Sequence, residues 1–221
     1  ESNQKKIEIL KNIIVLVYAV SAILWFIFIL STKNAGMYEG PLFNYVLTPF
    51  LLGMTILPIL GCILSFQKAK VWGGFKSAVG KSLITLGLGL LGWAAGMVIW
   101  NYYLFFAKVD VSFPSIADLF FVTIWPLWIF SMVQLSRATG AKFGFKNVKG
   151  KFVSIILALA AVLVSYYLLF IIGKGGVVDF GTSTPEIVLN LFYPIGDVLI
   201  LMSAALVFAL SYKFLGGRYK N

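Results

Sequence analysis

The sequence has no histidine, only one cysteine, and eight acidic residues against eighteen basic ones. Without an imidazole, the chain has no histidine ligand for haem, copper or zinc and no Ser-His or Cys-His pair for nucleophilic catalysis. Cys62 alone forms neither an intramolecular disulfide nor a thiolate metal site. These absences predict a protein that is not an enzyme and that carries no metal or cofactor.

Polar surface is also scarce, because 60% of the residues are apolar. Six long apolar runs are each close to the ~20 residues that a helix needs to cross a bilayer. They are Ile13–Leu30, Leu47–Phe66, Ser82–Phe105, Ile116–Leu135, Phe152–Ile172 and Ile187–Leu210. The segments between them are too short to bury a core of their own. The sequence therefore predicts an all-α polytopic membrane protein, a six-transmembrane-helix bundle that forms one domain over residues 1–221.

The basic residues are concentrated in every second gap between these runs, and this pattern predicts the topology. Short loops rich in Lys and Arg stay on the cytoplasmic side. Fifteen of the eighteen lie in alternate gaps: Lys5, Lys6, Lys11, Lys68, Lys70, Lys76, Lys81, Arg137, Lys142, Lys146, Lys149, Lys151, Lys213, Arg218 and Lys220. The other gaps hold only Lys33, Lys108 and Lys174. We expect a multi-pass protein of the cytoplasmic membrane with both termini inside.

The net charge of +10 has the same explanation. Basic residues at the membrane surface attract anionic lipid head groups, each by ~1 kcal/mol. Membrane lipids are therefore the expected partners of these charges, and nucleic acid is not.

Three hairpins follow one another, with spans that begin near residues 13, 82 and 152, and they suggest a threefold repeat of a helical hairpin. The segments Phe113–Asp118 and Tyr193–Asp197 both place an aromatic residue and a proline before an aspartate. If the units are equivalent, Asp118 and Asp197 each open a helix near the outer surface.

Small residues form a stripe along the third run. Thr85, Gly89, Gly92 and Gly96 are spaced at i, i+4, i+7 and i+11. Such a stripe lets another helix approach closely in a membrane. We expect this face to pack against another helix rather than lipid.

Asp118 and Asp197 are the only acids within the runs, and their depth decides their role. Ser115 and Asp118 match a capping box, which places Asp118 in a first helical turn where the helix dipole favours an anion. For Asp197 two arrangements are open. A helix unbroken from Thr184 places it near mid-membrane, whereas a new helix at Pro194, after a separate Pro185–Phe192 helix, places it one turn deep. We favour the second.

Aromatic and amide side chains gather at the expected outer ends of the helices. Trp and Tyr are typical interface anchors, but aromatic walls with a few polar groups also make small-molecule sites. The candidate ligand-binding residues are Trp100, Asn101, Tyr103, Asp118, Asn190, Tyr193 and Asp197.

Three short strings occur in a fixed order: WNYY at Trp100–Tyr103, FPSIAD at Phe113–Asp118 and YPIGD at Tyr193–Asp197. This series resembles the signatures of multi-span N-terminal membrane regions in bacterial diguanylate cyclases and in bacterial and archaeal sensor histidine kinases. The resemblance covers roughly residues 93–205. It implies a sensory input module in signal transduction, with a ligand that is generally unknown. No cyclase or kinase follows Lys213, so either an effector was removed or this is a free-standing relative.

The leading hypothesis is a non-enzymatic membrane module that senses or binds a ligand from the outer side. A substrate-binding component of a small-molecule transporter is the second, since such subunits of vitamin importers share this architecture. The third is a structural or assembly subunit, in which the small-residue stripe faces a membrane-protein partner or another copy of the chain. At the level of sequence all three stay open, as do the ligand and the oligomeric state.

Overall fold

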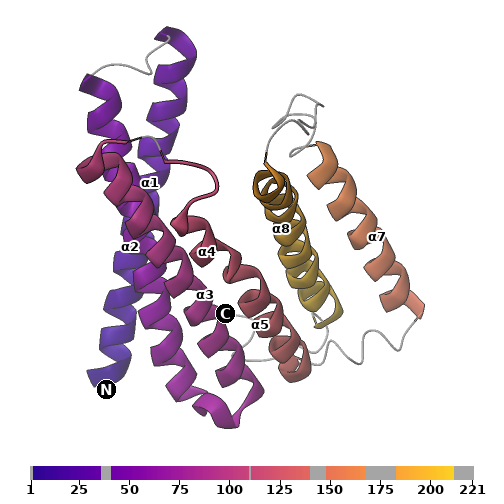
Figure 1. Ribbon diagram of the computed structural model, residues 1–221. Coiled ribbons are helices and arrows are strands. Elements are labelled where there is room, and N and C mark those ends of the chain that lie inside the picture. Colours follow the sequence, from indigo (N-terminus) through magenta and orange to yellow (C-terminus); the bar gives the residue numbers. More distant parts are fainter. Residues whose placement is uncertain (1, 36–40, 110, 140–147, 168–182, 212–221) are drawn as a thin grey trace. The chain divides into compact units, whose positions relative to one another are not determined.

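The computed structural model describes residues 2–35, 41–109, 111–139, 148–167 and 183–211, and these form helices with no strand (Figure 1). The all-α prediction is confirmed for this part of the chain. The helices are α1 (Ser2–Ala35), α2 (Pro41–Val71), α3 (Ala78–Asn101), α4 (Ile116–Val122), α5 (Ile124–Thr139), α7 (Val148–Ser165) and α8 (Thr184–Ser211). A short 3-10 helix covers Gly74–Lys76, and a π-helix over Tyr102–Ala107 continues α3.

Five segments of the described residues are long and apolar enough to cross a membrane: Lys5–Phe28, Tyr45–Val71, Ala78–Ala107, Ile116–Thr139 and Thr184–Phe208. The fourth combines α4 and α5. A span needs about 20 apolar residues, so the chain is a helical membrane protein. α7 covers the beginning of the expected run Phe152–Ile172, and the end of that run lies outside the described residues. So do the expected basic positions Lys142, Lys146, Lys174, Lys213, Arg218 and Lys220.

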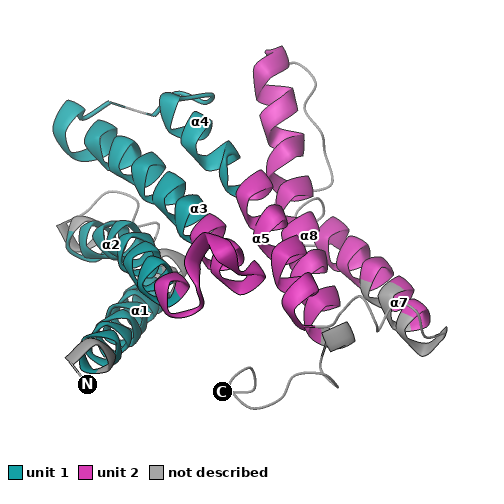
Figure 2. Cartoon of the chain, turned by 90° about the horizontal axis from the view of Figure 1, so that it is seen from below, with its two compact units in different colours: residues 1–68, 87–124 teal, residues 69–86, 125–221 magenta. Residues whose placement is uncertain are grey.

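The chain divides into two compact units (Figure 2). Unit 1 comprises residues 1–68 and 87–124, and unit 2 comprises residues 69–86 and 125–221. Unit 1 therefore contains α1, most of α2, the greater part of α3, and α4. Unit 2 contains the α2–α3 connection, the start of α3, and α5, α7 and α8. α7 and α8 are neighbours within unit 2.

Proline interrupts the helical structure at one position but not at another. α4 ends at Val122 and α5 begins at Ile124. Pro126 has no N–H to donate to the carbonyl of Val122, four residues earlier, which explains the interruption. Pro194, in contrast, lies inside α8, which runs without a break from Thr184 to Ser211. The expected separate helix over Pro185–Phe192 is therefore wrong.

The beginning of α8 is capped, and the helix then continues past its proline. Glu186 Oε2 accepts a hydrogen bond from the N–H of Ser183 at 3.0 Å, so an acidic side chain closes the first turn. From there the helix continues through a long apolar sequence. Membrane helices tolerate an internal proline, because surrounding groups re-satisfy the carbonyl that it frees.

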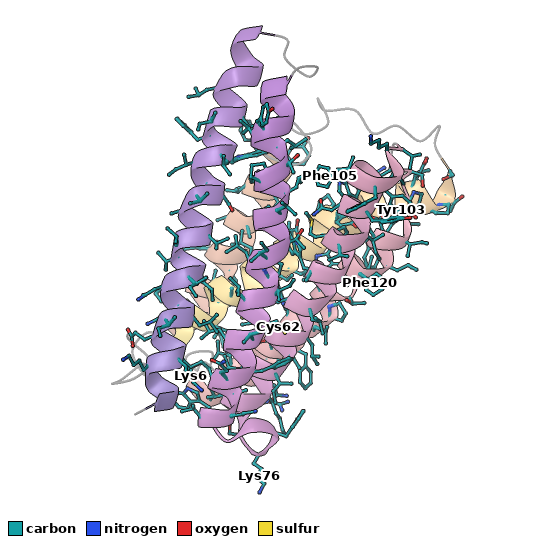
Figure 3. All side chains as sticks on the ribbon, turned by 90° about the vertical axis from the view of Figure 1, so that its left-hand side faces the viewer. Lys6, Cys62, Lys76, Tyr103, Phe105 and Phe120 are labelled. Carbon is teal, nitrogen blue, oxygen red and sulfur yellow. The ribbon has the colours of Figure 1, made fainter. Side chains whose placement is uncertain are left out.

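The α2–α3 connection in unit 2 is a tight loop. Gly73 and Gly74 adopt φ values of +85° and +56°, which a residue without a Cβ adopts readily. Ser77 then caps α3: its hydroxyl donates to the carbonyl of Trp72 and accepts from the N–H of Gly80 at 2.8 Å. Lys76 projects from this loop away from the helices (Figure 3). In unit 1, Lys6 on α1 and Tyr103 after α3 lie toward opposite ends of the helices (Figure 3).

Candidate functional site

Trp125, the second residue of α5, is the centre of an aromatic and polar cluster in unit 2. Its side chain is only 6% exposed. The indole N–H donates a hydrogen bond to Asp197 Oδ1 of α8 at 3.3 Å. The ring lies edge-on to Tyr193, with centroids 5.1 Å apart, and 5.9 Å from Phe192. One tryptophan thus joins α5 to two turns of α8.

Gly196 allows this contact because it has no side chain. A Cβ on Gly196 would lie 2.4 Å from ring atoms of Trp125, closer than any real van der Waals contact. The indole therefore rests against the backbone of α8. Three of the five residues of the YPIGD string, Tyr193, Gly196 and Asp197, contact Trp125. Packing against the single indole ring of Trp125 therefore explains the spacing of these three residues.

Asp197 lies near the middle of α8. Counted from Thr184, it is thirteen residues along the helix, or ~20 Å at 1.5 Å per residue. It is adjacent to the central residue of the apolar segment Thr184–Phe208. The expectation that Asp197 opens a helix near the outer surface, in the manner of Asp118, is therefore wrong. A carboxylate at this depth costs several kcal/mol unless a partner or water compensates its charge.

The carboxylate of Asp197 retains capacity for further partners. Asp197 is exposed. Within the part of the chain that the structure describes, Trp125 is the one residue that donates a hydrogen bond to this carboxylate. No Lys or Arg among those residues forms an ion pair with it. An ionised carboxylate offers about four acceptor positions. Among the described residues, most of this capacity is therefore open.

Three of the predicted ligand-binding residues share one face of α8. Asn190, Tyr193 and Asp197 are spaced at i, i+3 and i+7, which places them on one side of a helix. Asn190 and Tyr193 are half-buried, and Asp197 is exposed. We call these three residues the α8 polar face. Pro194 adds to it, because its missing N–H leaves the backbone carbonyl of Asn190 without its usual helical donor.

The polar contact in unit 1 is centred on Asn101, at the end of α3. Its side chain is 7% exposed, and its amide N–H donates to Thr55 Oγ1 of α2 at 2.8 Å. The Thr55 hydroxyl in turn donates to the carbonyl of Leu51 at 2.9 Å. Asn101 Oδ1 is buried and has no hydrogen-bond partner among the described residues. Asn101 thus connects α2 and α3 inside the unit.

The π-helix begins directly after Asn101. Single π-turns occur frequently at functional sites, since they change the direction of the side chains that follow. Tyr102 is exposed and stacks on Phe106 with the ring centroids 6.1 Å apart, whereas Trp100 and Tyr103 are half-buried. The WNYY string therefore directs its asparagine inward and its first tyrosine outward.

Asp118 has the capping role that its sequence predicts. It is buried in the first turn of α4, and its Oδ2 accepts from the Ser115 N–H at 2.7 Å and from the Ser115 hydroxyl at 2.9 Å. The capping box is complete. The helix dipole adds to these bonds, because it favours an anion in the first turn. Asp118 therefore has hydrogen-bond partners within its own turn.

The predicted binding residues divide between the two units. Trp100, Asn101, Tyr103 and Asp118 belong to unit 1, and Asn190, Tyr193 and Asp197 belong to unit 2. Within their own units, the structure brings together Asn190, Tyr193 and Asp197 on α8. One pocket that contains all seven residues stays a prediction.

The small-residue stripe of α3 is also divided. In unit 1, a Cβ on Gly92 would lie 2.7 Å from Thr123 Oγ1, and a Cβ on Gly96 would lie 2.4 Å from the Phe121 ring. Gly89 is buried. In unit 2, the Thr85 hydroxyl donates to backbone carbonyls of its own helix, at 3.0 Å to Lys81 and 3.1 Å to Ser82. Close packing on this face is thus seen at Gly92 and Gly96, where the chain after Ile116 approaches.

Trp125 was not among the residues selected from the sequence. Its position still carried a signal, because it lies near the middle of the segment Ile116–Thr139, whereas tryptophans in membrane proteins gather at the interfaces. A deep tryptophan has to find an acceptor for its indole N–H. The sequence around Thr55 gave no comparable signal. A single threonine in an apolar run is common, and its hydroxyl generally bonds the backbone of its own helix.

No group of three or more His, Cys, Asp and Glu side chains among the described residues is arranged to hold a metal ion. Comparisons of the chain with protein-family models, with curated proteins and with solved structures find no match. The functional argument therefore depends on the geometry of the chain itself.

Proposed function

We propose that this chain is a six-span sensory input module that binds a ligand from the outer side of the cell membrane, at Asp197, Tyr193 and Trp125. Both termini are cytoplasmic in this proposal. The alternation of basic residues along the sequence supports the topology, and five apolar helices of spanning length support the membrane location.

The observation that carries the proposal is the position of Asp197. An ionisable side chain within a membrane segment is costly, and such residues generally mark binding sites or ion pathways. Asp197 is near mid-span, is held by one indole N–H, and is otherwise open among the described residues. Asp118 lacks these properties, because its capping box satisfies it locally.

The continuity of α8 suggests how occupancy would be transmitted. The same uninterrupted helix carries the site at Asp197 and continues to Ser211 on the expected cytoplasmic side. Helix displacements of ~1–2 Å are a common means of signalling. A ligand that changes the contact between Trp125 and Gly196 would displace α8 against α5, and a rigid helix would carry that displacement inward. The resemblance of the three strings to sensory input regions agrees with this direction of signalling.

A transport function is the second candidate, and one observation favours it. The α8 polar face extends from Asn190 to Asp197, ~10 Å along the helix axis, and therefore leads toward mid-membrane. A carrier needs polar groups along the path of its substrate, whereas a sensor needs only the binding site. Uptake of a bound compound into proteoliposomes would identify a carrier, and saturable binding without uptake would identify a sensor.

The site is tested by ligand binding to the whole chain in lipid nanodiscs. Thermal unfolding is measured with a panel of cationic, neutral and anionic small molecules. Trp125→Phe removes the indole donor to Asp197, and Trp128→Phe is the matched control, because Trp128 donates instead to the carbonyl of Leu86 at 3.2 Å. We expect at least one compound to raise the unfolding midpoint of wild type and Trp128→Phe but not of Trp125→Phe. If no compound acts, or if the effect persists in Trp125→Phe, the proposal fails.

Labelling with a membrane-impermeant thiol reagent tests the topology. Single cysteines replace Lys76 and Lys108 in a Cys62→Ala background, because both lysines are exposed and the expected topology puts them on opposite sides. We expect the cysteine at 108 to react in intact cells and the cysteine at 76 to react only after lysis. Reaction of both in intact cells would contradict the six-span topology.

A further inference from the structure

We propose that the ligand of the α8 polar face is a small protonated amine, bound by Asp197 together with Tyr193 and Asn190. This inference rests on the proposed function and adds the chemical class of the ligand. It starts from charge: Asp197 is exposed near mid-span, and no cationic side chain among the described residues pairs with it. In an apolar surrounding, a positively charged ligand is the group that most effectively compensates a carboxylate.

The neighbouring groups include acceptors, which a cation with N–H donors requires. The carboxylate of Asp197 uses one oxygen for Trp125. The side-chain amide oxygen of Asn190 offers lone pairs, and the backbone carbonyl of Asn190 lacks a helical donor from Pro194. A primary ammonium has three N–H donors, so it can donate to the carboxylate and to two of these oxygens at once.

Tyr193 adds a second attraction for an organic cation. It precedes Asp197 by four residues, so the two side chains are neighbours on the helix surface. A cation within about 6 Å of an aromatic ring centroid is attracted by its π-electrons. The edge-on packing of Tyr193 against Trp125 fixes one side of the tyrosine ring, with an interplanar angle of 81°. The distance of four residues, ~6 Å along the axis, limits the cationic head group to a small size.

The same geometry does not suit a divalent metal. Calcium and magnesium take six or more oxygen ligands, generally with more than one carboxylate. Asp197 is the only acid of the α8 polar face, and the described residues hold no cluster of three His, Cys, Asp or Glu side chains. Trp125, which is buried under Tyr193 and Gly196, acts as a positioning residue that orients the carboxylate.

Calorimetric titration of the whole chain in zwitterionic phosphatidylcholine nanodiscs tests the ligand class. The probes are n-butylammonium, tetramethylammonium, 1-butanol and sodium ion. Butylammonium combines charge and N–H donors, tetramethylammonium has the charge alone, and butanol has the same chain without charge. We expect saturable binding of butylammonium, weaker binding of tetramethylammonium, and none of butanol or sodium.

Two variants of Asp197 and one control locate the binding. Asp197→Asn should weaken butylammonium binding by at least about tenfold, as expected for the loss of a charge-assisted hydrogen bond. Asp197→Glu keeps the charge and should retain binding, which separates loss of charge from misfolding. Glu186→Gln removes one negative charge from the first turn of the same helix, ~16 Å away along its axis, and should leave the affinity unchanged.

Equal binding of butylammonium to wild type and Asp197→Asn, or equal binding of butanol, would overturn the inference. If a neutral or anionic compound binds in a manner that depends on Trp125 while amines do not, the amine inference fails and the proposed ligand-binding function stands. If no probe and no compound of the panel binds, both fail.

Discussion

Asp118 and Asp197 follow similar aromatic and proline-containing strings, yet their surroundings are opposite. Asp118 is buried in the first turn of α4, where the N–H and the hydroxyl of Ser115 donate to one of its oxygens. Asp197 is exposed near the middle of α8 and accepts from Trp125 of another helix. An acid that its own turn satisfies needs no ligand, whereas an acid deep in a membrane segment needs a partner.

The two aspartates differ because their helices begin at different distances from them. Ser115 is the residue before α4, so Asp118 receives both the capping bonds and the favourable end of the helix dipole. Asp197 is thirteen residues beyond the start of α8, and the dipole effect is confined to the first turn. A similar string therefore serves capping at Asp118 and, in the proposed function, recognition at Asp197, according to where the helix starts.

The largest loss of stability is expected at the glycine in each unit against which an aromatic ring packs. Gly96→Leu in unit 1 and Gly196→Leu in unit 2 would both place atoms inside a ring that is already 2.4 Å from the site of a Cβ. Overpacking typically costs 1–3 kcal/mol for small additions, so we expect a loss of ~3 kcal/mol or more for either variant. Reversible unfolding in detergent measures this loss.

Ile195→Leu is the matched control for Gly196→Leu, because Ile195 is the preceding residue and its side chain is exposed. It should change the free energy of unfolding by less than ~0.5 kcal/mol. Full stability of Gly196→Leu would show that Trp125 does not rest on α8.

A smaller effect is expected at the capping box of α4. Ser115→Ala removes the hydroxyl that donates to Asp118 and should cost ~0.5–2 kcal/mol, as other losses of an N-cap do. Asp118→Asn should have a milder effect, because the amide oxygen still accepts from the Ser115 N–H. Unfolding titrations of both variants test this order. A ligand response that disappears in Ser115→Ala would assign unit 1 a direct role in binding.

The smallest effect is expected at the polar link between α2 and α3. Thr55→Val keeps the shape of the side chain but removes the acceptor of the Asn101 amide at 2.8 Å. Hydrogen bonds between membrane helices contribute ~0.6 kcal/mol on average, and we expect a loss of about this size. Thr85→Val is the control, since the Thr85 hydroxyl bonds only its own helix backbone. Equal losses in both variants would show that the link to Asn101 does not stabilise unit 1.

The comparison also shows which features a sequence can predict. The capping box of Asp118 was predictable because all its groups lie within four residues. The helical spans were predictable because apolar runs of sufficient length have few alternatives in a membrane. The unbroken α8 was not, because proline is a strong signal for a break, while the apolar run that favours continuation extends over the whole helix.

The contact between Trp125 and Asp197 could not be predicted from local sequence patterns. The two residues are 72 positions apart, and no periodicity along one helix indicates which other helix will supply a partner. Gly196 was equally ambiguous, since a glycine in a membrane helix can face lipid or a neighbour. Only the packed structure shows that this glycine, Tyr193 and Asp197 all contact one indole ring.

The most direct test of the central claim compares Asp118→Asn and Asp197→Asn in the same phosphatidylcholine nanodiscs, by the unfolding midpoint with and without butylammonium. We expect Asp118→Asn to lower the ligand-free midpoint slightly and to keep the ligand-induced rise. Asp197→Asn should keep or raise the ligand-free midpoint, because a charge leaves the membrane segment, and should lose the ligand-induced rise. A rise that survives in Asp197→Asn, or that disappears in Asp118→Asn, would contradict the assignment of recognition to Asp197 and of capping to Asp118.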